Sequence, residues 1–364
     1  MEGDHIKTNN FLVPLSWLYG LATSARNFMF ETGILKSKSY DIPIISIGNL
    51  TVGGTGKTPH TEYLIRLLQD KNQIAVLSRG YKRKSKGFVI AEKDTPMSKI
   101  GDEPYQMKKK FPNILMAVDK NRCEAIEKLT APEMKPEVDV ILLDDGYQYR
   151  YVQPGMNILL TDYHRLICFD KVLPAGRLRE PKRGKNRADV VIVTKCPANI
   201  TPMEMHGISR SLDLESWQQI FFTTFVYGNP YRMDDNTQTI TLDELATKEI
   251  LLVTGIASPE QMEYDLKKLG VKFEAMHFPD HHNFTAEEKS RIKERSRDKI
   301  ILMTEKDAAR IEGTFGEESS RVYVLPVEVE FLGDKDDIDF NKIIKSYVSK
   351  NSRNSILSKN RTKR

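Results

Sequence analysis

A glycine-rich segment that follows a β-branched run constrains this chain more than any other feature. Residues 44–58 read Ile-Ile-Ser-Ile-Gly-Asn-Leu-Thr-Val-Gly-Gly-Thr-Gly-Lys-Thr, which predicts a strand that runs into a loop and then a helix. Glycines let the backbone fold around an anion with its N–H groups pointing inward, while the lysine reaches the β/γ-phosphates and the last hydroxyl serves Mg²⁺. We therefore predict a nucleotide-phosphate site. Its members are Thr51, Val52, Gly53, Gly54, Thr55, Gly56, Lys57 and Thr58.

This loop departs from the common pattern at one position. The pattern G-x-x-x-x-G-K-[ST] requires glycine where this chain has Thr51, and Gly48 lies three residues earlier. We therefore expect the loop entry to differ from that of the common P-loop. The alternative interpretation is a glycine-rich turn between a strand and a helix, with Lys57 at the surface.

Length and cysteine content limit the class of protein. A chain of 364 residues is too long for one average core and suggests two domains. Cys123, Cys168 and Cys196 are odd in number and lack metal-ligand spacing. We therefore expect a reducing cytosolic setting with no disulfide framework and no zinc site.

Basic residues exceed acidic ones only slightly, by 55 to 50, but they gather in clusters. Such clusters suit polyphosphate, a phosphorylated substrate or anionic lipid headgroups, although each is often merely a solvated face. They lack the interleaved aromatic residues of a nucleic-acid platform, so we expect no nucleic-acid partner. The clusters lie at residues 79–86, 108–110, 177–187 and 350–364.

The most apolar stretch runs from Phe11 to Phe30. Its second half is too polar to span a bilayer, and it lacks the basic start and cleavage site of a secretory signal. Pro14 suits the first turn of a helix, and aromatic residues flanked by Lys7 and Arg26 suit a helix in a membrane interface. A helix packed on its own domain fits the residues alone equally well.

Short apolar runs alternate with helical or loop stretches along the rest of the chain, which predicts a mostly parallel sheet covered on both faces. A β-rich run, a Gly-Asn-Pro turn and a polar segment between Leu212 and Asp243 mark a domain junction, and a second α/β unit begins at Ile250. Beyond Tyr347 the polar, basic composition predicts disorder. The predicted strands lie at residues 74–77, 138–143, 156–160, 190–193, 220–226, 250–253 and 299–303.

Charged residues after several strands are candidate ligands for metal and phosphate. Asp144 and Asp145 end a buried-strand run, a rigid place from which carboxylates can hold Mg²⁺ beside the Thr58 hydroxyl. The segment 171–181 combines turn residues with two arginines, which can bind phosphate bidentately, and Glu180, a further candidate metal ligand. The segment 78–82 follows another strand and is a candidate clamp for an anionic substrate.

Two further segments are candidates for proton transfer. They are Gly-Asp-Glu-Pro at residues 101–104 and Phe-Pro-Asp-His-His-Asn-Phe at residues 278–284. An alcohol that attacks phosphorus must lose its proton, so a carboxylate poised by a histidine is a suitable base. A structural turn is the alternative for the second segment, and the residues alone do not place the two together.

Seven motifs in this order resemble those of the lipid A kinases, the tetraacyldisaccharide 4'-kinases of Gram-negative bacteria. The likeness covers most of the chain, and Thr51 fits the loop of that family. The motifs are Gly-Asn-Leu-Thr-Val-Gly-Gly-Thr-Gly-Lys-Thr-Pro, Ser-Arg-Gly-Tyr, Gly-Asp-Glu-Pro, Leu-Asp-Asp-Gly-Tyr-Gln, Leu-Pro-Ala-Gly-Arg-Leu-Arg-Glu-Pro, Phe-Pro-Asp-His-His and Thr-Glu-Lys-Asp-Ala.

The resemblance implies transfer of the ATP γ-phosphoryl group to the 4'-hydroxyl of tetraacyldisaccharide 1-phosphate, which gives lipid IVA, at the cytoplasmic face of the inner membrane. It implies a P-loop NTPase-like α/β/α sandwich with a mostly parallel sheet, plus a smaller α/β/α domain, with the site in the cleft between them. We divide the chain into an N-terminal interfacial region, a kinase core, a β-rich linker, a smaller domain, and a C-terminal helix with a basic tail. Their bounds are 1–35, 36–215, 216–240, 241–330 and 331–364.

The resemblance also assigns roles to matched residues. Lys57 and the loop glycines bind the ATP phosphates, Asp102 is the base or nucleophile activator, and His281 is its partner. Mg²⁺ is assigned to Thr58, Asp144, Asp145 and Glu180. Substrate contacts are predicted for Asn49, Arg79, Tyr81, Gln148, Arg177 and Arg179.

Two other functions remain compatible with the residues. One is a soluble P-loop kinase or GTPase for a polar substrate, although Thr194-Lys195-Cys196-Pro197 lacks the aspartate typical of guanine recognition. The other is an ATP-switched scaffold on nucleic acid or membrane, which would bind DNA in a salt-dependent way without turnover.

Overall fold

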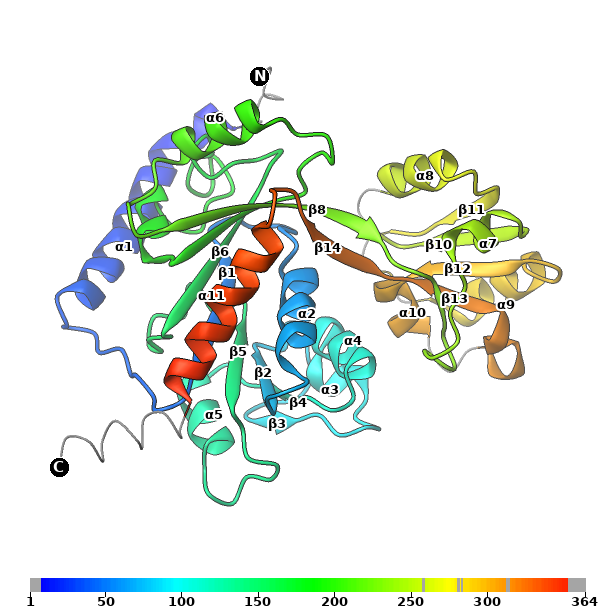
Figure 1. Cartoon of the computed structure of the whole chain (residues 1–364), viewed down its shortest axis with the longest axis horizontal. Coiled ribbons are helices and arrows are strands. Elements are labelled where there is room, and N and C mark those ends of the chain that lie inside the picture. Colours follow the sequence, from blue (N-terminus) through cyan, green and yellow to red (C-terminus); the bar gives the residue numbers. More distant parts are fainter. Residues whose placement is uncertain (1–7, 257–258, 280–281, 283, 312–314, 353–364) are drawn as a thin grey trace.

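The computed structural model of this chain describes residues 8–256, 259–279, 282, 284–311 and 315–352 (Figure 1). Its larger part is built on a nine-stranded sheet with the order β14-β8-β7-β6-β1-β5-β2-β4-β3. Neighbouring strands are parallel except at the two ends, where β3 is antiparallel to β4 and β14 to β8. The strands are β1 (Ile44–Asn49), β2 (Ile74–Ser78), β3 (Val89–Ile90), β4 (Leu115–Val118), β5 (Val140–Asp144), β6 (Met156–Asp162), β7 (Val190–Thr194), β8 (Gln219–Tyr227) and β14 (Val327–Phe331).

Helices cover both faces of this sheet because successive side chains of a strand point to opposite sides. In β1, Ile45 and Ile47 join one apolar cluster with α2 (Lys57–Leu68), α4 (Asp102–Lys110) and α11 (Asp336–Asn351). Ile44 joins another cluster with α5 (Arg122–Leu129), and α6 (Pro202–Leu212) covers a third on strands β6 to β8. Shorter or peripheral elements are η1 (Asn10–Leu12), α1 (Val13–Glu31), α3 (Met97–Ile100) and η2 (Lys182–Arg187).

The smaller part repeats this arrangement around a five-stranded sheet of order β11-β10-β12-β13-β9. Helices α7 (Leu242–Ala246) and α8 (Pro259–Lys268) share one apolar cluster, and α9 (Ala286–Arg295) and α10 (Glu305–Ile311) share another. The predicted α/β class, with a second smaller α/β/α unit, is confirmed. Its remaining elements are β9 (Tyr231–Arg232), β10 (Ile250–Thr254), β11 (Phe273–His277), β12 (Ile300–Thr304), β13 (Val322–Leu325) and η3 (Gly316–Arg321).

The chain passes between the two parts twice, through the paired strands that cross the centre of Figure 1. β8 continues past Gly228 into β9, and β13 continues past Pro326 into β14. The Gly228 N–H donates to the Pro326 carbonyl at 3.1 Å, and β8 and β14 pair antiparallel. Both strands belong to the larger sheet as well as to the connection, and the domain bounds given above stay a prediction.

The prediction of disorder beyond Tyr347 is wrong for residues 348–351, because α11 continues to Asn351. Phe340, Ile344 and Val348 are buried on the larger sheet. The Tyr347 hydroxyl donates to the Ile44 carbonyl at 3.0 Å and accepts from the Ile44 N–H at 3.1 Å. Helix α11 is therefore anchored on β1, at the centre of the sheet. Residues 353–364 lie outside the described part.

Candidate active site

The carboxyl ends of the parallel strands meet at one edge of the larger sheet. β1 and β5 are neighbours, with Ile47 beside Asp144 in the register. This edge therefore collects the glycine-rich loop after β1 and the two carboxylates at the end of β5, as strand ends in such sheets do. The strands that end here include β1 at Asn49, β2 at Ser78, β5 at Asp144 and β7 at Thr194.

The glycine-rich loop enters α2 through Gly56. Its φ of +84° is unfavourable for other residues, and a Cβ atom there would lie 2.5 Å from the Phe225 ring. The Asn49 amide donates to the Thr55 hydroxyl at 2.6 Å and so ties the two ends of the loop together. Lys57 and Thr58 then form the first turn of α2, where the helix N–H groups and dipole favour an anion.

His60 supports this loop from within the protein. Its Nδ1 lies 2.8 Å from the Gly56 carbonyl oxygen and its Nε2 lies 3.1 Å from the Thr223 hydroxyl of β8. Burial lowers the pKa of His60 to about 4, against the opposing effect of the Gly56 carbonyl. A carbonyl only accepts, so the neutral ring donates from Nδ1 and accepts at Nε2. Sequence reasoning missed this role, although His60 follows the motif directly.

Asp145 lies between two cations. Its Oδ1 is 3.7 Å from Lys57 Nζ and 3.0 Å from Arg179 Nη2. Burial opposes ionisation, but Lys57 and Arg179 outweigh it and hold the pKa of the Asp145 carboxyl below its usual value. The site therefore presents an ionised carboxylate that orients the loop lysine and an arginine at the same edge.

Asp144 is buried and only partly satisfied. Its Oδ2 accepts from the Ser78 hydroxyl at 3.1 Å, whereas its Oδ1 has no hydrogen-bond partner within the described part of the chain. Burial, followed by the charges of Glu103 and Asp145, raises the pKa of Asp144 to about 7, and Lys57 opposes this. A buried carboxylate oxygen without a partner is a place where a cation would be stabilising.

These carboxylates fit a magnesium ion. Mg²⁺ is usually held by one or two protein carboxylates together with phosphate oxygens and waters. Asp144, Asp145 and the Thr58 hydroxyl at the start of α2 offer such a partial set. Among the described residues, no group of three or more His, Cys, Asp or Glu side chains that could hold a metal is found.

Glu180, the fourth predicted metal ligand, has other partners in the structure. Arg187 donates to both of its oxygens, at 2.7 and 3.0 Å, and the Asn27 amide donates to Oε2 at 2.8 Å. The side chain thus links the 171–181 segment to α1. Metal binding by Glu180 stays a prediction.

The predicted substrate residues fall into two groups. Arg179 and Gln148 both donate to Asn49, at its side-chain and backbone oxygens respectively, so these three gather beside Asp145. The other three, Arg79, Tyr81 and Arg177, have exposed side chains. The Arg177 backbone nevertheless pairs with the glycine-rich loop, because its carbonyl accepts from the Val52 N–H at 2.8 Å.

Asp102 is the first residue of α4, after Gly101 with φ +94°. Its Oδ2 accepts from Nη2 and Nε of Arg310, at 2.9 and 3.3 Å, and Arg310 belongs to α10 of the smaller part. The sequence carries no signal for this contact. His281, the predicted partner of Asp102, lies outside the described residues. Its neighbour His282 pairs with Glu288, with Nε2 2.8 Å from Oε2.

A glycine-rich loop with its lysine at a helix start, opposite strand-end carboxylates and an arginine, defines a P-loop phosphotransferase. Comparison with known proteins narrows this class. The family model for tetraacyldisaccharide-1-P 4'-kinase, LpxK, matches residues 8–348, and the chain belongs to this family. The resemblance stated above is thereby confirmed.

Individual relatives agree over almost the whole chain. The chain is 52% identical to the tetraacyldisaccharide 4'-kinase of Phocaeicola vulgatus, over 98% of this chain and 99% of the relative. It is 48% identical to that of Bacteroides thetaiotaomicron, with 98% of each covered. The crystal structure of LpxK from Aquifex aeolicus in complex with ATP is similar with a TM-score of 0.74 and 32% identity, over 93% of this chain and 98% of that one.

Proposed function

We propose that this chain is an ATP-dependent phosphotransferase that phosphorylates the 4'-hydroxyl of tetraacyldisaccharide 1-phosphate, a lipid A precursor. The observation that carries the proposal is the placement of Lys57 and Asp145, 3.7 Å apart, at the strand edge of a chain of this family. Phosphoryl transfer depends on positioning and on neutralising charge on the transferred group. An edge with one lysine, one arginine and two carboxylates meets both needs.

Each side chain then has a role in the proposed reaction. The loop N–H groups and Lys57 bind the ATP phosphates, and Arg179 neutralises further charge at the same place. Asp144, Asp145 and Thr58 would hold Mg²⁺, which when bound supplies charge neutralisation on the phosphates. Asp102 accepts the proton that the attacking 4'-hydroxyl loses, with His281 as its proposed partner.

Transfer of label from γ-labelled ATP to detergent-dispersed tetraacyldisaccharide 1-phosphate tests this proposal. We expect label in the lipid from the wild type and a loss of about 10²-fold in kcat for Asp102→Asn, since a positioned base contributes that much. Glu127→Gln is the matched control, because this carboxylate forms an exposed pair with Lys38. A wild type that binds ATP but leaves the lipid unlabelled would reject the function.

We also propose that α1 docks the enzyme on the inner membrane as a peripheral protein of the cytoplasmic face. The helix turns polar groups towards the protein, since the Ser16 hydroxyl accepts from the Ala175 N–H at 2.9 Å and the Tyr19 hydroxyl donates to the Arg179 carbonyl at 3.1 Å. Most of its large apolar side chains face outward instead, which is the reverse of an ordinary surface helix. The exposed side chains are Leu15, Trp17, Leu18, Leu21 and Phe28 of α1 and Phe11 of the preceding η1.

Such a helix is suited to lying in a bilayer surface, where its apolar side chains enter the acyl boundary. Across the described ranges, no helix has the length and apolar character needed to cross a membrane. Support for this docking comes from the Tyr19–Arg179 contact, through which α1 lies beside the segment that carries Arg179 of the proposed phosphate site.

Flotation with anionic lipid vesicles tests the docking. We expect the triple variant Trp17→Ser, Leu18→Ser, Leu21→Ser to lose vesicle binding while ATP binding is retained. A double variant at exposed residues of α6, Met203→Ser, His206→Ser, serves as the control. Unchanged flotation of the α1 variant would make the helix a packing element only.

A further inference from the structure

Two helices from different parts of the molecule are joined by charged contacts at both ends. Asp102 at the start of α4 pairs with Arg310 near the end of α10, and Lys110 at the end of α4 pairs with Glu305 at the start of α10. This pairing makes the two helices antiparallel. Helix α4 belongs to the larger part and α10 to the smaller part, so both contacts cross between the parts.

The first contact is rigidly built on the side of the smaller part. The Arg310 side chain is only 2% exposed, and its Nη1 lies 3.6 Å from Asp307 Oδ1. Asp307 is fully buried, and its Oδ2 accepts from the Gly255 N–H at 2.9 Å and the Thr304 hydroxyl at 2.7 Å. Arg310 is therefore held in place by the ends of β10 and β12 before it reaches Asp102.

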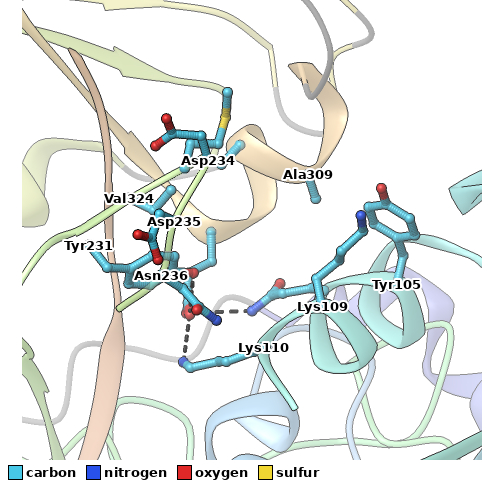
Figure 2. Close-up of a pocket in the computed structure, with 13 residues that line it drawn as sticks. Tyr105, Lys109, Lys110, Tyr231, Asp234, Asp235, Asn236, Ala309 and Val324 are labelled. Atoms are coloured by element: carbon cyan, nitrogen blue, oxygen red, sulfur yellow. Dashed lines mark hydrogen bonds and ion pairs between the residues drawn. The ribbon is translucent and has the colours of Figure 1, made fainter. Parts of the chain in front are cut away.

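The second contact fixes α4 against the helix that carries Lys57. Lys110 Nζ lies 2.6 Å from Glu62 Oε2 in α2 and 2.5 Å from Glu305 Oε1 in α10. Figure 2 shows Lys110 and Lys109 on α4, with Tyr231 on the opposite side of the pocket. Burial and the charge of Glu305 raise the pKa of Glu62 to about 7, against the effect of Lys110.

We propose that Arg310 is a positioning residue for Asp102, which orients the carboxylate for proton transfer only while the two parts are held together as seen here. The proposal rests on the role of Asp102 proposed above. It gives a task to the segment Thr304-Glu305-Lys306-Asp307-Ala308, which has no part in the phosphate site. Asp307 holds Arg310 in place, and Glu305 holds α10 against α4 at the other end.

Two donors on one oxygen, Nη2 at 2.9 Å and Nε at 3.3 Å from Oδ2, hold that oxygen in place more closely than a single hydrogen bond does. A misplaced reacting group costs rate even when binding is intact, by up to about 10²-fold for a 1 Å shift. Lysine keeps the charge but not the paired donors, so it restores only part of the effect.

A double-mutant cycle on the full chain tests the proposal, with label transfer from γ-labelled ATP as the readout. We expect Arg310→Met to lower kcat by about 30-fold, and Arg310→Lys by about 5-fold, with the KM for ATP changed less than about 3-fold. In the Asp102→Asn background, Arg310→Met should change kcat less than about 3-fold, because its effect passes through Asp102.

The proposal is overturned if Arg310→Met lowers kcat by the same factor in both backgrounds, or if it raises the KM for ATP and leaves kcat intact. Either result would make the Arg310–Asp102 contact a merely structural pair. Melting temperature and ATP binding are measured for every variant. If Arg310→Met does not fold, the cycle is run with Arg310→Lys. Additive effects of Arg310→Lys and Asp102→Asn on kcat would likewise overturn the proposal. Failure of the proposed function is distinct, since it shows as absent label transfer by the wild type.

Discussion

The phosphate side and the proton-accepting side of the proposed site are held in different ways. Lys57, Asp145 and Arg179 all lie at the edge of one sheet, where Asp145 pairs with both cations. Asp102 lies on α4 and takes its contact with Arg310 from the other part of the molecule. Folding of the larger sheet is thus enough to assemble the first side, whereas the second also requires that the two parts be correctly placed.

The largest expected effect lies on the phosphate side. Lys57→Ala should lower kcat by about 10³-fold, because it removes a fixed charge from the transferring group. Single-turnover label transfer at saturating ATP measures this, with the exposed Lys128→Ala as a control on a remote lysine. A loss smaller than tenfold would show that the phosphate side does not supply the charge stabilisation of the transferring group.

A smaller effect, on stability, is expected at the contact between the parts. Lys110→Met should cost about 3 kcal/mol of stability, because Glu62 and Glu305 then face each other without a cation between them. Glu305→Gln is the matched variant and should cost less, since the Lys110–Glu62 pair remains. Urea unfolding at pH 8 compares the two. Equal stability of Lys110→Met and wild type would show that α4 is not held by this network.

The smallest expected effect is on the pH dependence of stability, through His60 on the phosphate side. The pKa of His60 is lowered to about 4, so the unfolded chain takes up a proton first as pH falls from 6.5. The stability due to neutral His60 is present above pH 6.5 and is lost as pH falls towards 4, by about 2 kcal/mol at pH 5.

His60→Gln should therefore be less stable than wild type at pH 7.5, with a deficit that narrows by about 2 kcal/mol at pH 5. Urea unfolding at both pH values measures this. His206→Gln on α6 is the control, since His206 is exposed and should show no such narrowing. A deficit that is the same at both pH values would mean that His60 is accessible to protons in the folded state.

The difference between the phosphate side and the proton-accepting side also explains what could be predicted from the sequence. The strand, the glycine-rich loop and the first turn of α2 are contiguous in the chain, and parallel strands end at a common edge, so Lys57 and Asp145 could be brought together by pattern alone. Asp102 and Arg310 are 208 residues apart, and no local pattern sets the placement of one sheet relative to another. The contact could be found only in the structure.

The end of the predicted C-terminal helix did carry a signal. The polar composition beyond Tyr347 predicted disorder, yet Phe340, Ile344 and Val348 recur every four residues, the spacing of a buried helical stripe. Composition averaged over the tail concealed this pattern. The supporting contacts of Phe225 and Thr223 beneath the loop, by contrast, depend on β8 lying next to β7, an order that strand prediction does not supply.

The crossing strands make the smaller part an insertion within the larger one. Residues 231–325 leave β8 and return to β14 at neighbouring points, where Gly228 contacts Pro326. During synthesis, β14 and α11 therefore emerge only after the whole insertion has been made. Until then β8 has no partner on its outer edge, and Ile44 lacks the tyrosine that later caps it. Synthesis of the larger, nucleotide-binding part therefore starts first, and this part is completed only after the smaller part has been made.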